Sequence, residues 1–271
     1  MLKRVALSAV KASAAAADSI RRPASGVVIL LYHRVGGRSG LQVDLPVEMF
    51  TRQMEVLAEQ GQAVSLDAAL EKLATGGPGG HNPVVVTFDD GTADFVDTVV
   101  PILDRFRVPA TLYVATDFIE SGRSFPDDGR PASWSGLSEA MSTGLVTIGS
   151  HTHTHALLDR LNEARIEDEL VRSIELIQDT LDAPGEHFAY PKAVAGSTAA
   201  DAAVRERFRS AALGGNRANP PGRTDPHRLA RSSIQVADSM RWFDHKLSGG
   251  MALEETLRRT LNRLRYARVT T

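Results

Sequence analysis

The chain has 271 residues, the size of one large domain or two small ones. Its 42 % hydrophobic and 24 % charged residues exclude a disordered chain or a collagen-like fibre, and its net charge of −2 gives no global reason to bind nucleic acid. Because there is no cysteine, disulfides, thiolate zinc sites and a cysteine nucleophile are excluded, and any metal site must use histidine and carboxylate ligands.

The amino-terminal segment, residues 1–25, begins with Lys3 and Arg4 and continues into an alanine-rich stretch. This is the outline of a signal peptide, but Lys11 interrupts its apolar core. We therefore expect an alanine-rich helix that lies against the domain or the membrane surface, followed by a single domain over residues 26–271. A cytoplasmic or membrane-peripheral location is expected in preference to secretion.

Short apolar runs alternate along the rest of the chain with longer helical patterns. Several of the runs are apolar throughout, which is typical of parallel strands covered on both faces. Strands are predicted at 27–32, 84–88, 110–115, 146–149, 187–190, 210–213 and 232–236. Helices are predicted at 47–60, 65–74 with Ser65 as cap, 92–106, 162–181 with Asn162 as cap, and about 251–266. This alternation predicts one α/β barrel-like domain, with its chemistry just beyond the carboxyl ends of the strands.

The first candidate site residues end the predicted strand 84–88, where the sequence T-F-D-D-G contains Asp89 and Asp90. Two neighbouring carboxylates do not both ionise readily unless a cation or an arginine compensates their charge. A metal bound to one of them would leave the other free as a base. Taken alone, the pair is better explained as a turn in which an aspartate caps a helix.

A second cluster, G-S-H-T-H-T-H, follows the predicted strand 146–149 and contains His151, His153 and His155. Alternate residues of an extended segment face the same way, and residues four apart meet across one helical turn. Two histidines and one carboxylate, with water in an open position, form a catalytic zinc arrangement, although the same set could bind Fe(II) and activate oxygen. The cluster favours metal binding over a solvated loop.

Two further predicted strands end in notable residues. The run V-V-I-L-L-Y-H-R-V carries His33 at the end of strand 27–32, where a polar residue beside a loop is the simplest interpretation. The run H-F-A-Y-P-K-A stops at Pro191, because proline cannot donate to the hydrogen-bond ladder of a sheet. The chain then exposes backbone N–H groups toward the same end of the barrel.

The combination of T-F-D-D-G with G-S-H-T-H-T-H about sixty residues later resembles the NodB-homology polysaccharide deacetylases, carbohydrate esterase family 4. The resemblance covers most of the chain and implies a distorted (β/α) barrel of about seven parallel strands. It implies that Asp89 is the catalytic base. It also implies that Asp90, His151 and His155 bind a divalent metal, with Zn²⁺ expected first and Co²⁺ or Ni²⁺ as alternatives.

The sequence departs from the usual family pattern at two motifs. No late L-x-H is present, but L-Y-H at 31–33 resembles the circularly permuted branch, which includes poly-N-acetylglucosamine deacetylases, and implies that His33 is the general acid. The motif R-x-P-Y is replaced by A-Y-P-K, so the group that orients Asp89 is open, while the backbone N–H of Lys192 can still stabilise an oxyanion. Arg231 lies in H-R-L-A-R, which resembles an L-x-R segment of this branch.

The resemblance implies hydrolysis of N-acetyl groups on the sugars of a polysaccharide or glycoconjugate, with this glycan as partner and no nucleic acid. An O-acetyl esterase, a hydrolase of small C–N compounds and a non-catalytic glycan-binding barrel are the alternatives. Trp134 and Tyr190 could stack on a sugar, and residues 118–133 are expected to frame the groove. The helix at 251–266, rich in leucine and arginine, is expected to cover the barrel, with peripheral membrane contact as the alternative.

Overall fold

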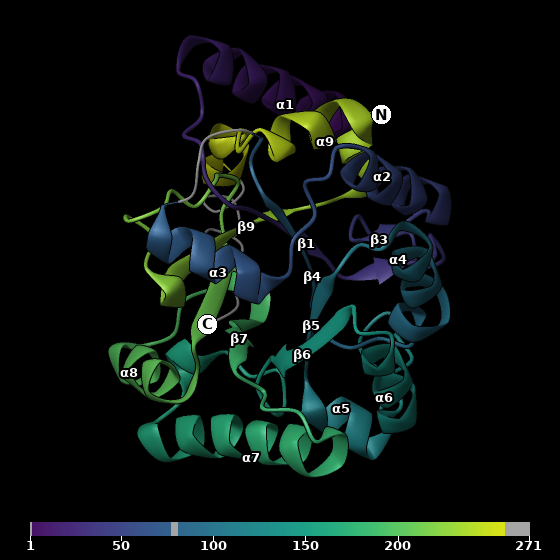
Figure 1. Ribbon diagram of the computed structural model, residues 1–271, viewed down its shortest axis with the longest axis vertical. Coiled ribbons are helices and arrows are strands. Elements are labelled where there is room, and N and C mark those ends of the chain that lie inside the picture. Colours follow the sequence, from purple (N-terminus) through teal and green to yellow (C-terminus); the bar gives the residue numbers. More distant parts are fainter. Residues whose placement is uncertain (1, 77–80, 258–271) are drawn as a thin grey trace.

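The computed structural model describes residues 2–76 and 81–257, and in it parallel strands close into a barrel (Figure 1). The strand order is β1-β4-β5-β6-β7-β8-β9, and β9 pairs with β1. The barrel strands are β1 (Val28–Tyr32), β4 (Val84–Phe88), β5 (Ala110–Val114), β6 (Val146–Ser150), β7 (His187–Ala189), β8 (Ser210–Gly214) and β9 (Leu229–Ser233). A small separate sheet pairs β2 (Arg34–Val35) with β3 (Asp44–Leu45). The predicted α/β barrel is confirmed.

The last strand is displaced from its prediction. The range 232–236 is wrong, because β9 spans Leu229–Ser233 and has Arg231 within it rather than before it. Arg231, Ser232 and Ser233 are polar yet buried. A search for an apolar run overlooks such a strand, since the burial of Arg231 depends on a distant partner described below.

Helices surround the barrel (Figure 1). They are α1 (Leu2–Ile20), α2 (Val47–Glu59), α3 (Leu66–Thr75), α4 (Val100–Phe106), α5 (Thr116–Ser121), α6 (Trp134–Ser142), α7 (Glu163–Leu181), α8 (Thr198–Arg207) and α9 (Ser239–Leu247). A π-helix, Phe95–Val99, leads into α4, and short 3-10 turns occur at Leu158–Arg160, Pro191–Ala193, Pro226–Arg228 and Val236–Asp238. Ser65 and Asn162 cap α3 and α7 as predicted. Of the helix predicted at 251–266, residues 252–257 are helical, residue 251 is not, and residues 258–266 lie outside the described residues.

Helix α3 closes the amino-terminal end of the barrel. Its Asp67 pairs with Arg209, directly before β8, and with His187, the first residue of β7. Its apolar residues Leu66, Ala69 and Leu73 pack against inward-facing strand residues that include Ile29, Val85, Tyr113 and Ala212. With this end covered, the carboxyl ends of the strands remain for binding and chemistry.

The amino-terminal helix α1 packs against α9 and the residues just after it (Figure 1). Ala14 and Ala15 of α1 contact Trp242 of α9 and Met251. Among the described residues, no helix is both long enough and apolar enough to span a membrane.

A buried ion cluster reinforces this contact. Lys11 of α1, only 1 % exposed, donates hydrogen bonds to Asp238 and Glu254. Lys246 of α9 lies 2.8 Å from the other oxygen of Asp238. Burial raises the pKa of Asp238, but the two ammonium groups outweigh this effect and hold its pKa below the ordinary value. The lysine that interrupts the apolar stretch in the sequence therefore joins segments 227 positions apart along the chain.

Replacing Lys11 by methionine is expected to lower the free energy of unfolding by about 3–5 kcal/mol, because the buried carboxylates of Asp238 and Glu254 are left with a single ammonium group, that of Lys246. Urea denaturation would measure the change. A matched control is Arg52→Met, which removes an exposed ion pair with Glu55 and is expected to lower the free energy of unfolding by less than about 1 kcal/mol. An unchanged midpoint for Lys11→Met would show that this ion cluster does not stabilise the fold.

Candidate active site

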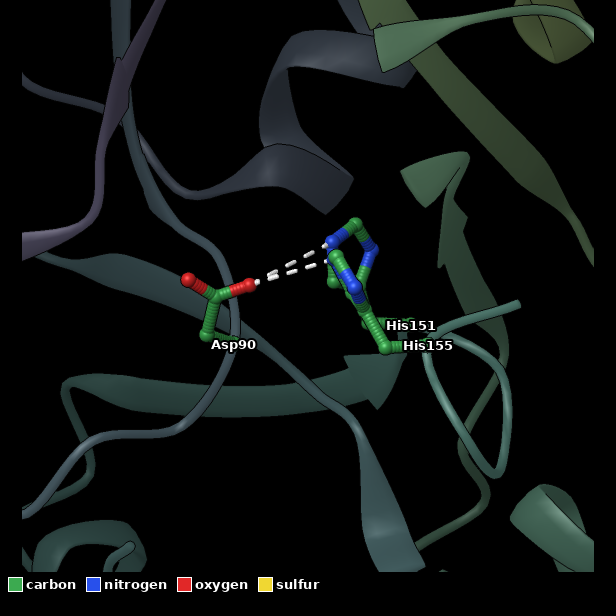
Figure 2. Close-up of side chains that lie close together, drawn as sticks. All are labelled: Asp90, His151 and His155. Atoms are coloured by element: carbon green, nitrogen blue, oxygen red, sulfur yellow. Dashed lines mark ion pairs between the residues drawn. The ribbon is translucent and has the colours of Figure 1, made fainter. Parts of the chain in front are cut away.

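The carboxyl ends of β4 and β6 bring together Asp90, His151 and His155 (Figure 2). Asp90 lies two residues beyond β4, and His151 directly follows β6. Oδ1 of Asp90 is 3.4 Å from Nε2 of His155 and 3.8 Å from Nε2 of His151. The three ligand atoms lie within 4.8 Å of one another. Figure 2 shows both imidazole rings directed toward the carboxylate of Asp90.

This arrangement fits a divalent metal ion. Ligands at about 2.0–2.1 Å from one tetrahedral zinc ion are roughly 3.3 Å apart, close to the separations between Asp90 and the two rings. Nδ1 of His151 lies 2.7 Å from the backbone carbonyl of Ala189, which orients the ring and leaves Nε2 facing the site. Burial, and next the neighbouring His151, lower the pKa of His155 to about 4, so this ring is neutral near pH 7, as a metal ligand must be.

The backbone bends sharply where these ligands leave their strands. Asp90, Thr152 and His155 have φ values of 76°, 65° and 63°, in the left-handed region that residues other than glycine rarely adopt. The carbonyl of Asp90 accepts a hydrogen bond from the N–H of Ala115 at 3.0 Å. The bend after β4 allows both Asp89 and Asp90 to approach His151, whose Nε2 is 3.8 Å from each carboxylate.

Asp89 is bound by Arg231, which reaches past β1 from β9. The guanidinium donates from Nη1 to Oδ1 of Asp89 at 2.6 Å and from Nη2 to Oδ2 at 2.8 Å. The two residues are 2 % and 0 % exposed. Burial alone raises the pKa of Asp89, but the charges of Arg231, His151 and His33 outweigh it and lower the pKa to about 2. The sequence did not show which group orients Asp89. In the structure, Arg231 binds and orients this carboxylate.

His33 and Lys192 lie around this centre. His33 is half-buried, its charge acts on Asp89, and its buried Nδ1 has no hydrogen-bond partner among the described residues. Lys192 follows Pro191 in a left-handed conformation, with φ of 55°, and its exposed side chain contributes to the lowered pKa of His155.

Other residues singled out in the sequence lie apart from the centre. Buried His153 pairs through Nδ1 with the hydroxyl of Thr116 at 2.9 Å, so only two of the three clustered histidines face Asp90. The suggestion that Tyr190 stacks on a sugar is wrong, because its side chain is 1 % exposed. Trp134 begins α6, packs against the core and donates from Nε1 to Glu120 at 2.8 Å.

A cavity of about 450 Å³ is lined by Arg34 and Asp94, but not by Asp90, His151 or His155. Residues 127–130 of the predicted groove segment also line it. Arg34 holds that segment by donating to the carbonyls of Asp127 and Pro126 at 2.9 and 2.6 Å. The loop predicted to frame a groove therefore borders a cavity, but one that the candidate metal-binding residues do not line.

The closed parallel barrel of seven strands with surrounding helices matches that of a NodB-type deacetylase domain. The polysaccharide deacetylase family model matches residues 76–210, about half of the chain. The chain belongs to the polysaccharide deacetylase family. His33 and Arg231 lie outside the matched residues.

The chain is also similar to individual deacetylases, both in sequence and in structure. The poly-beta-1,6-N-acetyl-D-glucosamine N-deacetylase of Escherichia coli K12 is 29 % identical over 141 residues, which are 48 % of this chain but only 21 % of that protein. The structure of IcaB from Ammonifex degensii matches with a TM-score of 0.73 and 23 % identity, covering 83 % of this chain and 98 % of that one. The deacetylase PplD of Streptococcus pyogenes, solved with acetate, matches with a TM-score of 0.71 and 20 % identity, covering 83 % and 99 %.

Proposed function

We propose that the protein is a metal-dependent hydrolase that removes N-acetyl groups from the sugars of a polysaccharide or glycoconjugate. The observation that carries this proposal is the Asp90–His151–His155 group beside an ionised, arginine-bound Asp89. The N-deacetylase activity of the Escherichia coli relative supports an N-acetylated glycan as substrate, although the matching region covers only 21 % of that protein.

The metal is held, in this proposal, by Asp90, His151 and His155, with Zn²⁺ favoured and Co²⁺ or Ni²⁺ as alternatives. When bound, the cation supplies Lewis-acid polarisation of the acyl group and makes a nearby water more acidic. The neutral form of His155 and the orientation of His151 by Ala189 support this assignment.

Asp89 acts as the general base and takes a proton from the attacking water. Arg231 keeps the carboxylate ionised and fixes both of its oxygens. The water oxygen forms a bond to the acyl carbon, and the backbone N–H of Lys192 donates to the developing oxyanion, a contact typically worth about 2.7–4 kcal/mol.

His33 acts as the general acid in this scheme. An amide requires one, because an unprotonated amine anion is a poor leaving group. As the C–N bond breaks, His33 gives a proton to the nitrogen. The products are acetate and a free amino sugar.

Metal removal tests the proposal. After treatment with a chelator, we expect acetate release from N-acetylglucosamine oligomers to fall to background and to return on addition of Zn²⁺, with acetate quantified in both states. An O-acetylated oligosaccharide serves as the second substrate. Release from the O-acetylated substrate alone would replace the proposal by an esterase, and no release from either by the zinc-loaded protein would overturn it.

A further inference from the structure

We infer that Glu169 of α7 is a positioning residue that holds the segment 151–155 in the conformation required for metal binding. The inference rests on the proposed function, because it assumes that His151 and His155 are metal ligands. It assigns a role to a carboxylate that the proposed mechanism does not use.

Glu169 contacts the segment at three atoms. Its Oε2 accepts from the backbone N–H of Thr154 at 2.8 Å, and its Oε1 accepts from the hydroxyl of the same residue at 2.6 Å. Its backbone carbonyl accepts from the N–H of His153 at 3.1 Å. One residue of α7 therefore fixes the two positions between Thr152 and His155.

The segment requires such support because its backbone is strained. Thr152 and His155 both have positive φ, a conformation that is unfavourable for a residue with a side chain. Conformations of this kind persist only where the surrounding structure determines them. Since His155 directly follows Thr154, loss of the bonds to Glu169 would release the backbone that directs His155 toward Asp90.

Neighbouring elements support the segment from other directions. The hydroxyl of Ser173, four residues along α7 from Glu169, lies 2.5 Å from the hydroxyl of Ser150, which in turn accepts from the N–H of Thr152 at 3.2 Å. On the α5 side, the N–H of Asp117 donates to the carbonyl of His153 at 2.9 Å. The segment is thus held between α5 and α7, and Glu169 makes the charged contacts.

The complete burial of Glu169 indicates that its contacts with residues 153 and 154 are a specific feature of the fold. Its side chain is 0 % exposed on the face of α7 that also carries Ile166 and Leu170. Arg165 is the nearest cation, with Nη2 3.7 Å from Oε1, and it is itself exposed. A carboxylate at such a position is costly unless its hydrogen bonds are satisfied, and the partners here are the two donors of Thr154.

The test compares zinc affinity in purified Glu169→Gln, Thr154→Val and wild-type protein, by competition with a chromophoric chelator. Glutamine preserves the shape of the side chain but removes its charge and can accept from only one of the two Thr154 donors, so the Thr154 hydroxyl must turn and accept from the amide NH₂. We expect a weaker zinc affinity for Glu169→Gln, by up to about the 10–100-fold found when a group bonded directly to a metal ligand is lost, because Glu169 acts one residue further away, through Thr154. Thr154→Val keeps the backbone contact and should weaken binding less.

Glu167→Gln is the matched control, because Glu167 lies on the same helix but is exposed and binds Arg207. It should bind zinc as the wild type does. The visible spectrum of the Co²⁺-loaded proteins adds a readout of ligand geometry that a loss of stability alone would not alter.

Wild-type zinc affinity and Co²⁺ spectra in both Glu169→Gln and Thr154→Val would overturn the inference, even if thermal stability fell. Should Glu169→Gln fail to fold, Thr154→Val decides: weaker zinc binding supports the role, and unchanged binding refutes it. Absence of zinc binding by the wild type would instead refute the proposed function, so the two failures are distinguishable.

Discussion

Replacing Asp90 by alanine is expected to weaken zinc binding by more than about 100-fold and to abolish acetate release, because loss of a direct ligand exceeds the 10–100-fold effect of losing an outer-shell partner. Asp90 is the carboxylate of the candidate metal group, and its Oδ1 faces both histidines. The neighbouring Asp89 is not a member of this group and instead accepts bonds from Arg231 through both of its oxygens.

The measurement is zinc content after dialysis against a weak chelator, together with acetate release, in the same preparation. Asp104→Ala is the matched control, because it removes an exposed carboxylate that pairs with Arg107 on the outside of the barrel. It should retain wild-type zinc content. Stoichiometric zinc in Asp90→Ala, held with wild-type affinity, would exclude Asp90 as a ligand.

The barrel could be predicted from sequence because buried parallel strands appear as short apolar runs. The strands at 84–88 and 110–115 could be predicted without knowing which strands lie beside them, because each is largely apolar and is buried along its whole length. The prediction failed at β9, where Arg231 and two serines occupy buried positions. A buried charge has no local signature when its partner lies elsewhere in the chain.

Spacing explains how much of the candidate site could be predicted. Asp89 and Asp90 are adjacent, and His151 and His155 are four residues apart, so short motifs contain most of the centre. Arg231 and Asp89, which are hydrogen-bonded, lie 142 positions apart in the sequence. The resemblance of the segment around Arg231 to a family L-x-R motif was the only sequence feature that pointed to Arg231.

Glu169 was missed for a different reason. Helix α7 has a clear apolar periodicity, and charged residues of such a helix are normally expected on its exposed face. Glu169 instead follows Ile166 by three residues and precedes Ser173 by four, which places it on the buried face. A carboxylate within the apolar stripe of a helix was the available signal, and its partner, Thr154, is visible only in the folded chain.

Replacing Asp89 by asparagine is expected to preserve zinc binding and to lower turnover by about 10²–10⁴-fold, the usual contribution of a general base. Asparagine matches aspartate in shape but cannot take a proton from water. The candidate metal ligands Asp90, His151 and His155 are untouched. The variant therefore separates loss of the base from loss of the metal.

The substitution also affects stability, because Arg231 is fully buried and Asp89 provides its counter-charge. Breaking a buried pair costs about 3–5 kcal/mol, and the remaining carbonyl oxygen of asparagine offsets part of this by accepting one bond from the guanidinium. Turnover and zinc content should therefore be measured well below the midpoint of thermal unfolding. Full turnover in folded, zinc-loaded Asp89→Asn would exclude Asp89 as the base. Loss of zinc would mean that this carboxylate, rather than Asp90 alone, helps to hold the metal.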